Sequence, residues 1–246
     1  PGPDITAATF RSTLERYGQS PAGRLFLDSS IPVIRGFGSS AAAQVAGHDL
    51  ARAALGLGMD RDESFNAALS REGHGDNAGP CVFGGLCAIV PNEDRPRVVP
   101  LRLSTEVGFA YAAPAEPLAT SEARAALPSK VDHAIAIEAL GRLAALLEGL
   151  AHGDPSLITS GIQDALHVPY RLPLIQGGAE AVAAGYEAGA WGVTISGGGS
   201  GLIAVCPPEV ADRVASAMRA VFDHGRDDPE CMGFVVRPDT VGLRRL

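Results

Sequence analysis

The chain has 246 residues, of which 46% are hydrophobic and 20% charged, a composition typical of a globular protein with one large or two medium domains. Its formal net charge of −8 argues against a surface for nucleic acid or for anionic membranes. No apolar run reaches membrane-spanning length and no signal region opens the chain, so we expect a cytoplasmic protein. The four cysteines form no CxxC pair, which favours reduced thiols over a zinc site.

The first 105 residues alternate between helical and extended patterns. We expect a helix over residues 7–17, a strand over 23–28 and a helix over 41–57 whose N-cap is Ser39 or Ser40. Asp60 predicts the N-cap of a second helix that ends near residue 71, with Glu63 as its capping-box partner. An apolar strand over 81–90 and a surface hairpin or loop over 91–100 follow.

Residues 34–44, Ile-Arg-Gly-Phe-Gly-Ser-Ser-Ala-Ala-Ala-Gln, form the most informative stretch. Two glycines permit backbone conformations closed to other residues, and a helix begins directly after them. The positive end of that helix could hold a phosphate, but an ordinary capped helix after a glycine turn fits equally well. A Walker-type loop is excluded because its lysine is missing, and Lys130 is the only lysine in the chain.

Two further polar stretches stand out. Residues 71–80, Arg-Glu-Gly-His-Gly-Asp-Asn-Ala-Gly-Pro, suit metal or substrate contacts, although Asp and Asn are also ordinary turn formers. Residues 196–201, Ser-Gly-Gly-Gly-Ser-Gly, join two expected strands, and their backbone could press against a ligand or form only a flexible turn.

The second half of the chain predicts another layered domain, with a boundary near residue 105. We expect strands over 107–113, 191–195, 202–206 and 233–236, a short helix that starts at Thr120, and longer helices over 132–152, 155–166, 177–189 and 208–222. A leucine stripe on the helix over 132–152 is interpreted as core, and its members are Leu140, Leu143, Leu147 and Leu150. Helices that alternate with antiparallel hairpins indicate an α+β fold.

The order of these motifs resembles that of the GHMP small-molecule kinases. Gly-Phe-Gly-Ser-Ser-Ala-Ala at 36–42, Glu-Gly-His-Gly-Asp-Asn at 72–77 and Ser-Gly-Gly-Gly-Ser-Gly at 196–201 match its three motifs in order and spacing. Thr-Ser-Glu-Ala-Arg at 120–124 and Asp-Ala-Leu-His-Val-Pro-Tyr-Arg at 164–171 are similar to the homoserine kinases within that family. The resemblance implies an N-terminal domain over residues 1–105 like ribosomal protein S5 domain 2, and a ferredoxin-like C-terminal domain over 106–246.

The resemblance also implies site residues and cofactors. ATP and Mg²⁺ are expected, with Ser40 and Glu72 as metal ligands and Ser39 as the alternative hydroxyl. The residues expected to contact ATP are Arg35, Gly36, Phe37, Gly38, Ser39, Ser40, Ala41 and Thr120. Those expected to contact the substrate are Asn77, Arg124, His167, Arg171 and Gly198, with Asn77, Glu72 and Arg124 taking part in catalysis. An arginine can grip a carboxylate with two parallel hydrogen bonds, although a surface position or a salt bridge is the ordinary alternative for Arg124 and Arg171.

The implied activity is ATP-dependent phosphorylation of the L-homoserine side-chain hydroxyl to O-phospho-L-homoserine, on the route to threonine, by a homodimer. The alternatives are a kinase of another small hydroxyl metabolite in this family, and an inactive homologue that acts in binding or assembly. The chain opens at Pro1, and the family segment of the Ala-Asn-Leu-Gly-Pro-Gly-Phe-Asp type has no counterpart in it. We therefore expect several tens of residues to be missing at its start.

Overall fold

A computed structural model describes residues 4–21, 23–93, 95–224 and 228–245. The chain forms two compact units, neither of which is continuous in sequence. Unit 1 contains residues up to Pro32, then Gly38–Leu101 and the tail from Pro238, whereas unit 2 contains Val33–Phe37 and Arg102–Arg237. Compact units and family domains are different divisions of a chain, so the expected boundary near residue 105 stays a prediction.

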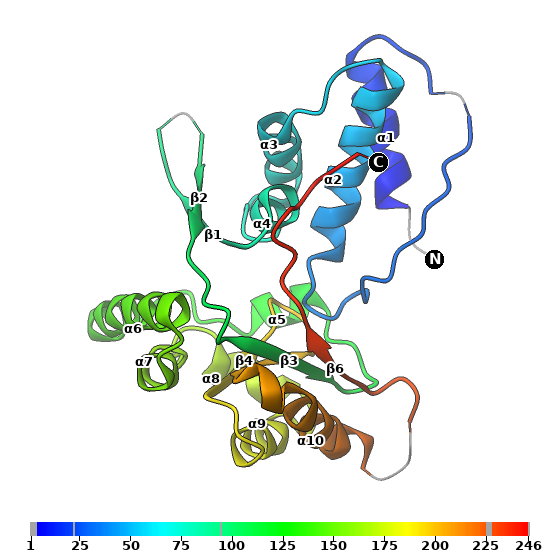
Figure 1. The fold of residues 1–246 in the computed structure, drawn as a ribbon. Helices are drawn as coiled ribbons and strands as arrows, with labels where there is room; N and C mark the ends of the chain where they lie inside the picture. The colour runs from blue at the N-terminus through cyan, green and yellow to red at the C-terminus, as the bar shows by residue number, and fades with distance from the viewer. Residues whose placement is uncertain (1–3, 22, 94, 225–227, 246) are drawn as a thin grey trace. The chain divides into compact units, whose positions relative to one another are not determined.

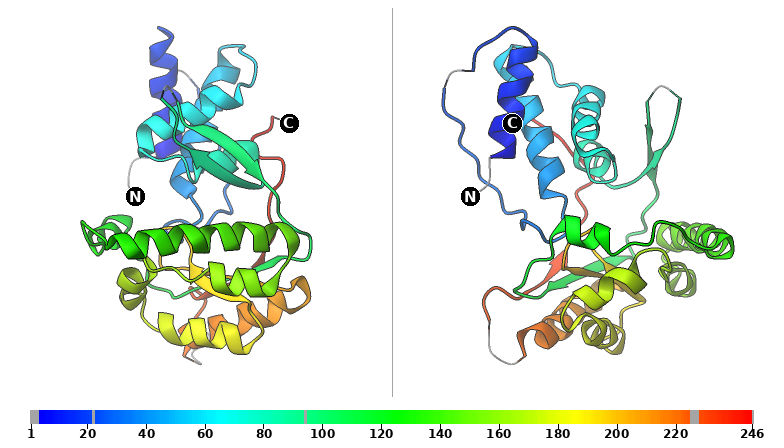
Figure 2. Two further views of the ribbon diagram at one scale, coloured as in Figure 1. Left: turned by 90° about the vertical axis from the view of Figure 1, so that its left-hand side faces the viewer. Right: turned by 180° about the vertical axis from the view of Figure 1, so that it is seen from behind.

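Unit 2 is built on a four-stranded antiparallel sheet. Its strands are β3 (Gly108–Ala113), β4 (Gly192–Ile195), β5 (Leu202–Cys206) and β6 (Met232–Val236), in the order β4-β5-β3-β6. Helices α9 (Gly178–Glu187) and α10 (Ala211–Asp223) cover one face of the sheet (Figures 1 and 2). This strand order and the alternation of strands with helices are those of a ferredoxin-like domain, as expected.

Successive side chains along β3 point to opposite faces of this sheet. Ala110 and Ala112 point into the core with α9 and α10, where small side chains let the helices approach the strand. Tyr111 points to the opposite face, where its ring lies 4.4 Å from that of Phe37 and 5.2 Å from that of Phe234, measured between centroids. Residues 33–37 therefore cover part of the second face.

The remaining helices of unit 2 correct one prediction. They are α5 (Thr120–Ala125), α6 (His133–His152), α7 (Pro155–Gly161) and α8 (Val168–Arg171), with 3₁₀ turns at Leu172–Leu174 and Pro208–Val210. Leu150 is buried, but Leu140 and Leu143 are 68% and 50% exposed, so the interpretation of the whole stripe as core was wrong. The reason is that α7 ends at Gly161, five residues earlier than expected, and the close contacts of Gly149 and Gly161 place it against the part of α6 that follows Leu140.

The described residues of unit 1 form four helices and one hairpin. They are α1 (Ile5–Arg16), α2 (Ser39–Ala54), α3 (Arg61–Glu72), α4 (Ala78–Phe83), β1 (Leu86–Val90) and β2 (Arg97–Leu101), with β1 and β2 antiparallel. The expected strand over 81–90 therefore begins as a short helix, which ends at Gly84, where φ is +78°. The core of the unit includes Val45, Phe65 and Val82.

The strand expected over residues 23–28 does not form in the described part of the chain. These residues are irregular, and the side chain of Phe26 is 90% exposed. A β-strand needs hydrogen bonds from a neighbouring strand, and β1 is paired only with β2 among the described strands. Local composition alone was therefore insufficient evidence for a strand.

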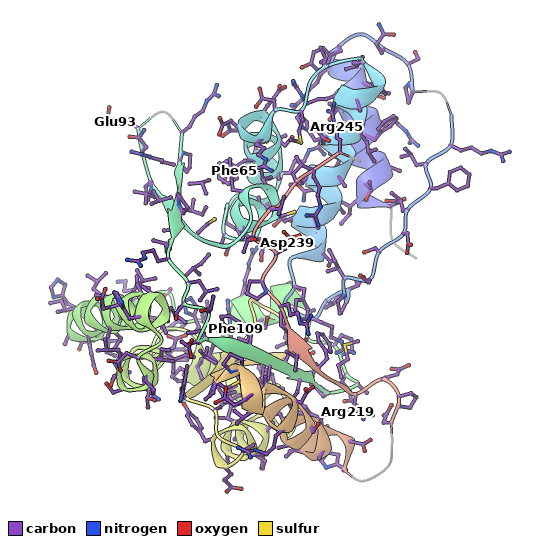
Figure 3. The ribbon with its side chains drawn as sticks, in the orientation of Figure 1. Phe65, Glu93, Phe109, Arg219, Asp239 and Arg245 are labelled. Carbon is purple, nitrogen blue, oxygen red and sulfur yellow. The ribbon has the colours of Figure 1, made fainter. Side chains whose placement is uncertain are left out.

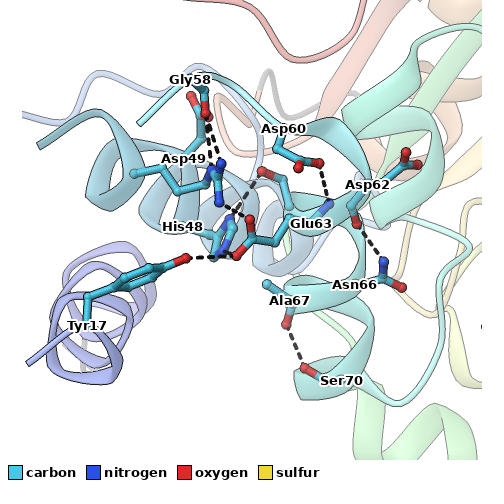
Figure 4. Close-up of polar contacts among 12 residues, drawn as sticks. Tyr17, His48, Asp49, Gly58, Asp60, Asp62, Glu63, Asn66, Ala67 and Ser70 are labelled. Carbon is cyan, nitrogen blue, oxygen red and sulfur yellow. Dashed lines mark hydrogen bonds and ion pairs between the residues drawn. The ribbon is translucent and has the colours of Figure 1, made fainter. Parts of the chain in front are cut away.

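Polar contacts join helices α1, α2 and α3 (Figure 4). Asp60 caps α3 as expected, because its side chain accepts a hydrogen bond from the Glu63 N–H. The Glu63 carboxylate does not complete the capping box: it pairs with Arg52 of α2 and accepts a hydrogen bond from the Tyr17 hydroxyl. Half of the predicted capping box is therefore replaced by contacts between helices.

The C-terminal tail packs against the helices of unit 1 (Figure 3). Arg245 forms two parallel hydrogen bonds to the carboxylate of Asp49 on α2, at 2.9 and 2.8 Å, and Asp49 is only 5% exposed. Arg61 of α3 donates to the carbonyls of Val241 and Leu243. Among the described residues, no helix is both long and apolar enough to cross a membrane.

Candidate functional site

The glycine loop ends at the start of α2. Gly36 and Gly38 both have positive φ, at +81° and +66°. The helix begins at Ser39 with Gly38 as its N-cap, so the expected serine N-cap was wrong. Gly38 has no side chain to pair with the first N–H groups, and the structure gives this helix end no side-chain cap. The backbone N–H groups in the first turn of α2 can therefore donate hydrogen bonds to an anion.

Asn77 lies against this glycine within unit 1. A Cβ atom built on Gly38 would stand 2.8 Å from Oδ1 and 2.9 Å from both Cβ and Cγ of Asn77. Two of the sequence motifs thus meet at this point. Two features of this position require glycine: the left-handed backbone conformation and the absence of space for a side chain.

Ser40 and Glu72 are joined through Gln44, one helical turn after Ser40. The amide nitrogen of Gln44 donates to the Ser40 hydroxyl at 3.3 Å and to Oε1 of Glu72 at 3.0 Å. The two expected metal ligands therefore share one hydrogen-bonding neighbour, although α2 and α3 supply them separately. Gln44 itself was missed in the sequence, where its spacing of four residues from Ser40 on a helix was the available signal.

A hydroxyl oxygen and a carboxylate oxygen are among the ligands that Mg²⁺ takes from proteins. Among the residues that the structure describes, no three His, Cys, Asp or Glu side chains gather into a metal-binding group. Mg²⁺ is commonly held by one or two protein oxygens together with phosphate oxygens and water. A hydroxyl and a carboxylate beside the helix end match that chemistry.

In unit 2, the start of the glycine loop is fixed by Arg35. Its guanidinium is buried and donates to the Ser200 hydroxyl and the Glu116 carbonyl, both at 2.9 Å, and to the Ala115 carbonyl at 2.5 Å. The carbonyl of Arg35 accepts a hydrogen bond from the Tyr111 hydroxyl at 2.6 Å. Burial raises the pKa of Tyr111, which keeps this hydroxyl protonated and able to donate.

The third motif lies against the same loop. The Ser196 hydroxyl donates to the Gly36 carbonyl at 3.0 Å. A Cβ atom on Gly199 would stand 2.5 Å from the Gly36 nitrogen, and one on Gly201 would overlap the Tyr111 hydroxyl. Gly198 belongs to the turn that these contacts hold. The glycines of this motif thus permit two backbone segments to touch, a contact that the sequence did not reveal.

Arg171 contacts the helix that carries Arg124, the other arginine expected to bind the substrate carboxylate. Arg171, at the end of α8, is half-buried and donates from Nε to the carbonyl of Ala123 at 2.9 Å, the residue directly before Arg124 on α5. Its two Nη groups have no hydrogen bond or ion pair with any described residue. His167 precedes α8, is exposed, and has its Nδ1 3.2 Å from the Asp164 carboxylate.

The structure thus separates the predicted residues into two groups. Unit 1 contains Ser39, Ser40, Ala41, Glu72 and Asn77, together with Gly38. Unit 2 contains Arg35, Gly36, Phe37, Arg124, His167, Arg171 and Gly198. Ala41 is fully buried. The side chain of Thr120 lies outside the described part of the structure.

A glycine loop before a helix, a hydroxyl–carboxylate pair and a ferredoxin-like unit are together typical of a small-molecule kinase. Two family models match the chain, the GHMP kinases N terminal domain over residues 4–85 and the GHMP kinases C terminal domain over 136–224. The chain belongs to the GHMP kinase family. Membership of a kinase family implies the use of ATP.

Curated relatives and solved structures show which members of this family the chain is similar to. The chain is 43% identical to proteins named homoserine kinase from Synechococcus sp. (strain RCC307) and Prochlorococcus marinus (strain MIT 9303), over 79% and 77% of its length. It spans 62% and 60% of the length of those two relatives. A crystal structure of homoserine kinase from Cytophaga hutchinsonii is similar with a TM-score of 0.85 and 29% identity, covering 97% of this chain and 77% of that one. Mevalonate kinase of L. major, at 16% identity, a TM-score of 0.64 and coverage of 96% and 77%, shares the fold.

Proposed function

We propose that the chain catalyses, within its whole protein, the phosphorylation of the side-chain hydroxyl of L-homoserine by ATP. The relatives at 43% identity are named for this substrate, whereas the likeness to mevalonate kinase extends to the fold alone. The γ-phosphoryl group moves to the hydroxyl oxygen: a new P–O bond forms, the bond to the β-phosphate oxygen breaks, ADP leaves, and the hydroxyl proton is lost. The product is O-phospho-L-homoserine, an intermediate of threonine biosynthesis.

The anchoring of Arg171 on α5, the helix that also carries Arg124, is the observation that carries this proposal. An amino-acid substrate brings a carboxylate, and a guanidinium can bind it with two parallel hydrogen bonds. Among the described residues, Arg171 bonds only through Nε, to the α5 backbone. This bond orients the guanidinium and leaves both Nη groups available to a substrate. We assign the carboxylate grip to Arg171 with Arg124, and contacts beside it to His167 and Gly198.

The remaining roles fall to the residues around the start of α2. We assign the nucleotide phosphates to the Arg35–Ala41 stretch, whose donors are the backbone N–H groups of the first helical turn and the serine hydroxyls. Ser40 and Glu72 would hold Mg²⁺, which supplies charge neutralisation for the phosphates when it is bound. Asn77 orients the substrate hydroxyl, because its amide lies beside Gly38 at the same end of α2.

The test is an ADP-release assay with Mg-ATP on this chain and on the whole product of its gene. L-Homoserine is compared with L-serine, L-threonine and mevalonate. We expect turnover with L-homoserine. Turnover with a different hydroxyl compound would replace homoserine by that substrate, and silence with all four in the whole gene product would refute L-homoserine as the substrate and favour a binding or assembly role.

Two variants make this test specific to the carboxylate grip. Arg171→Ala should raise the KM for L-homoserine about 10- to 150-fold, because a hydrogen bond to a charged group contributes about 1.5–3 kcal/mol. The matched control is Arg142→Ala, since Arg142 of α6 contacts Glu138 and the Gln163 carbonyl and is not assigned to the site. An unchanged KM in Arg171→Ala would remove this residue from the substrate site. The expected homodimer stays a prediction, which light scattering on the purified protein would test.

A further inference from the structure

Gln44 stands out as a polar side chain in a buried position that no role in the fold explains. It lies on α2 between Ala41 and Val45, both of which are fully buried in the core of unit 1, and is itself only 7% exposed. Burying an amide is unfavourable unless its polar atoms are paired. An apolar side chain of similar size would fill the same space without that requirement.

The contacts of this amide are one-sided. Its nitrogen donates to both the Ser40 hydroxyl and Oε1 of Glu72, whereas its oxygen is buried and has no hydrogen-bond partner among the described residues. The reverse orientation would place the amide oxygen against the Glu72 carboxylate, two acceptors facing each other. The carboxylate therefore fixes the amide, and the unpaired oxygen results from giving both donors to these two partners.

The oxygen atoms of Ser40 and Glu72 also keep acceptor positions that Gln44 does not occupy. Glu72 receives the amide on Oε1, and its second oxygen has no hydrogen bond or ion pair with the described residues. The Ser40 hydroxyl oxygen carries two lone pairs, of which the amide takes one. Each partner is thus held by a neutral donor while one acceptor position stays available. A lysine or arginine in place of Gln44 would hold the carboxylate too, but its charge would repel a cation.

We propose that Gln44 is a positioning residue for the divalent cation, which sets the separation between the Ser40 hydroxyl and the Glu72 carboxylate. This inference rests on the proposed function, because it takes Ser40 and Glu72 as the metal ligands. Residues that orient metal ligands through hydrogen bonds typically change metal affinity by about 10- to 100-fold when they are replaced. Gln44 acts here through its amide nitrogen, on the side chains of Ser40 and Glu72.

The test measures the Kd for Mn²⁺ by electron paramagnetic resonance, with the β,γ-imido analogue of ATP present at saturation. The variant is Gln44→Met, which retains the volume of the side chain and removes both donors and the unpaired oxygen. We expect its Kd for Mn²⁺ to rise about tenfold or more, with a melting temperature equal to or above that of the parent chain. A merely structural residue would show the reverse, a lower melting temperature and an unchanged Kd.

The matched control is His48→Met, one helical turn further along α2. His48 is 3% exposed and contacts Ser64 of α3 at 3.2 Å, so it shares the helix, the packing partner and the burial of Gln44. We expect His48→Met to lower the melting temperature while the Kd for Mn²⁺ stays within twofold. Adding Gln44→Met to Glu72→Gln should change the Kd less than twofold further, because the residue acts through that carboxylate.

The possible outcomes separate this inference from the proposed function. If the whole product of the gene binds no Mn²⁺ with the analogue, the metal site assigned to Ser40 and Glu72 is refuted and this inference with it, whereas the ADP-release assay tests the proposed function separately. Binding by the parent with an equal Kd in Gln44→Met would refute the positioning role alone. If Gln44→Met does not fold, Gln44→Leu replaces it, and loss of folding in both variants would make Gln44 a structural residue.

Discussion

Replacing Gly38 by alanine tests the junction between the glycine loop and Asn77. At a φ of +66°, a residue with a side chain costs about 1–2 kcal/mol, because its Cβ approaches the following carbonyl. The added Cβ would also stand 2.8–2.9 Å from three atoms of Asn77. One of these is the Asn77 Cβ, so rotation of the side chain cannot relieve the contact. Overpacking of this kind costs about 1–3 kcal/mol, which gives about 2–5 kcal/mol in total.

Gly56 provides a matched control at the other end of the same helix. Its φ is +72°, close to that of Gly38, but a Cβ added there would meet no atom within 4 Å. Gly56→Ala should therefore carry only the backbone cost of about 1–2 kcal/mol. The difference between the two variants, about 1–3 kcal/mol, measures the contact with Asn77 alone.

The assay is urea unfolding followed by circular dichroism, with the midpoint and slope of each variant compared. Asn77→Ala in the Gly38→Ala background should recover part of the loss, because it removes two of the three crowded atoms, and the two changes should be non-additive. Equal losses in Gly38→Ala and Gly56→Ala, or strict additivity with Asn77→Ala, would show that Gly38 is needed only for its backbone conformation.

Three further predictions concern stability. Burial, with Arg52 as the next cause, lowers the pKa of His48 below its ordinary value of 6.5, so the unfolded chain binds a proton more readily. The stability that His48 contributes should thus be complete above about pH 6.5 and lost as the pH falls below it. In His48→Gln, the midpoint of urea unfolding should change less between about pH 7.5 and pH 5.5 than it does in the parent chain. Arg245→Met should lower the melting temperature by leaving a buried carboxylate unpaired, whereas Arg244→Met, which breaks an exposed pair, should not. Tyr111→Phe should cost about 1–3 kcal/mol in urea unfolding by leaving a buried carbonyl without its donor, and Tyr186→Phe, which removes no described hydrogen bond, should be neutral.

The sequence by itself was sufficient for most of the local structure. Helix α3 begins after Asp60 because an aspartate side chain can pair with an N–H three residues further on, whatever the rest of the chain does. The strands of unit 2 were readable from short apolar runs bounded by glycine and proline. The order of the three motifs was likewise sufficient to recognise the family.

Contacts between distant segments were decided only by the tertiary structure. No local pattern shows that Gly38 lies against Asn77, that Arg35 holds the carbonyls of residues 115 and 116, or that Gln44 joins Ser40 to Glu72. The wrong prediction of a strand over residues 23–28 has the same cause, since these residues have the composition of a strand but no partner among the described strands. Capping and periodicity depend on residues a few positions apart, whereas a close approach, a paired buried charge or a strand partner depends on segments that only folding brings together.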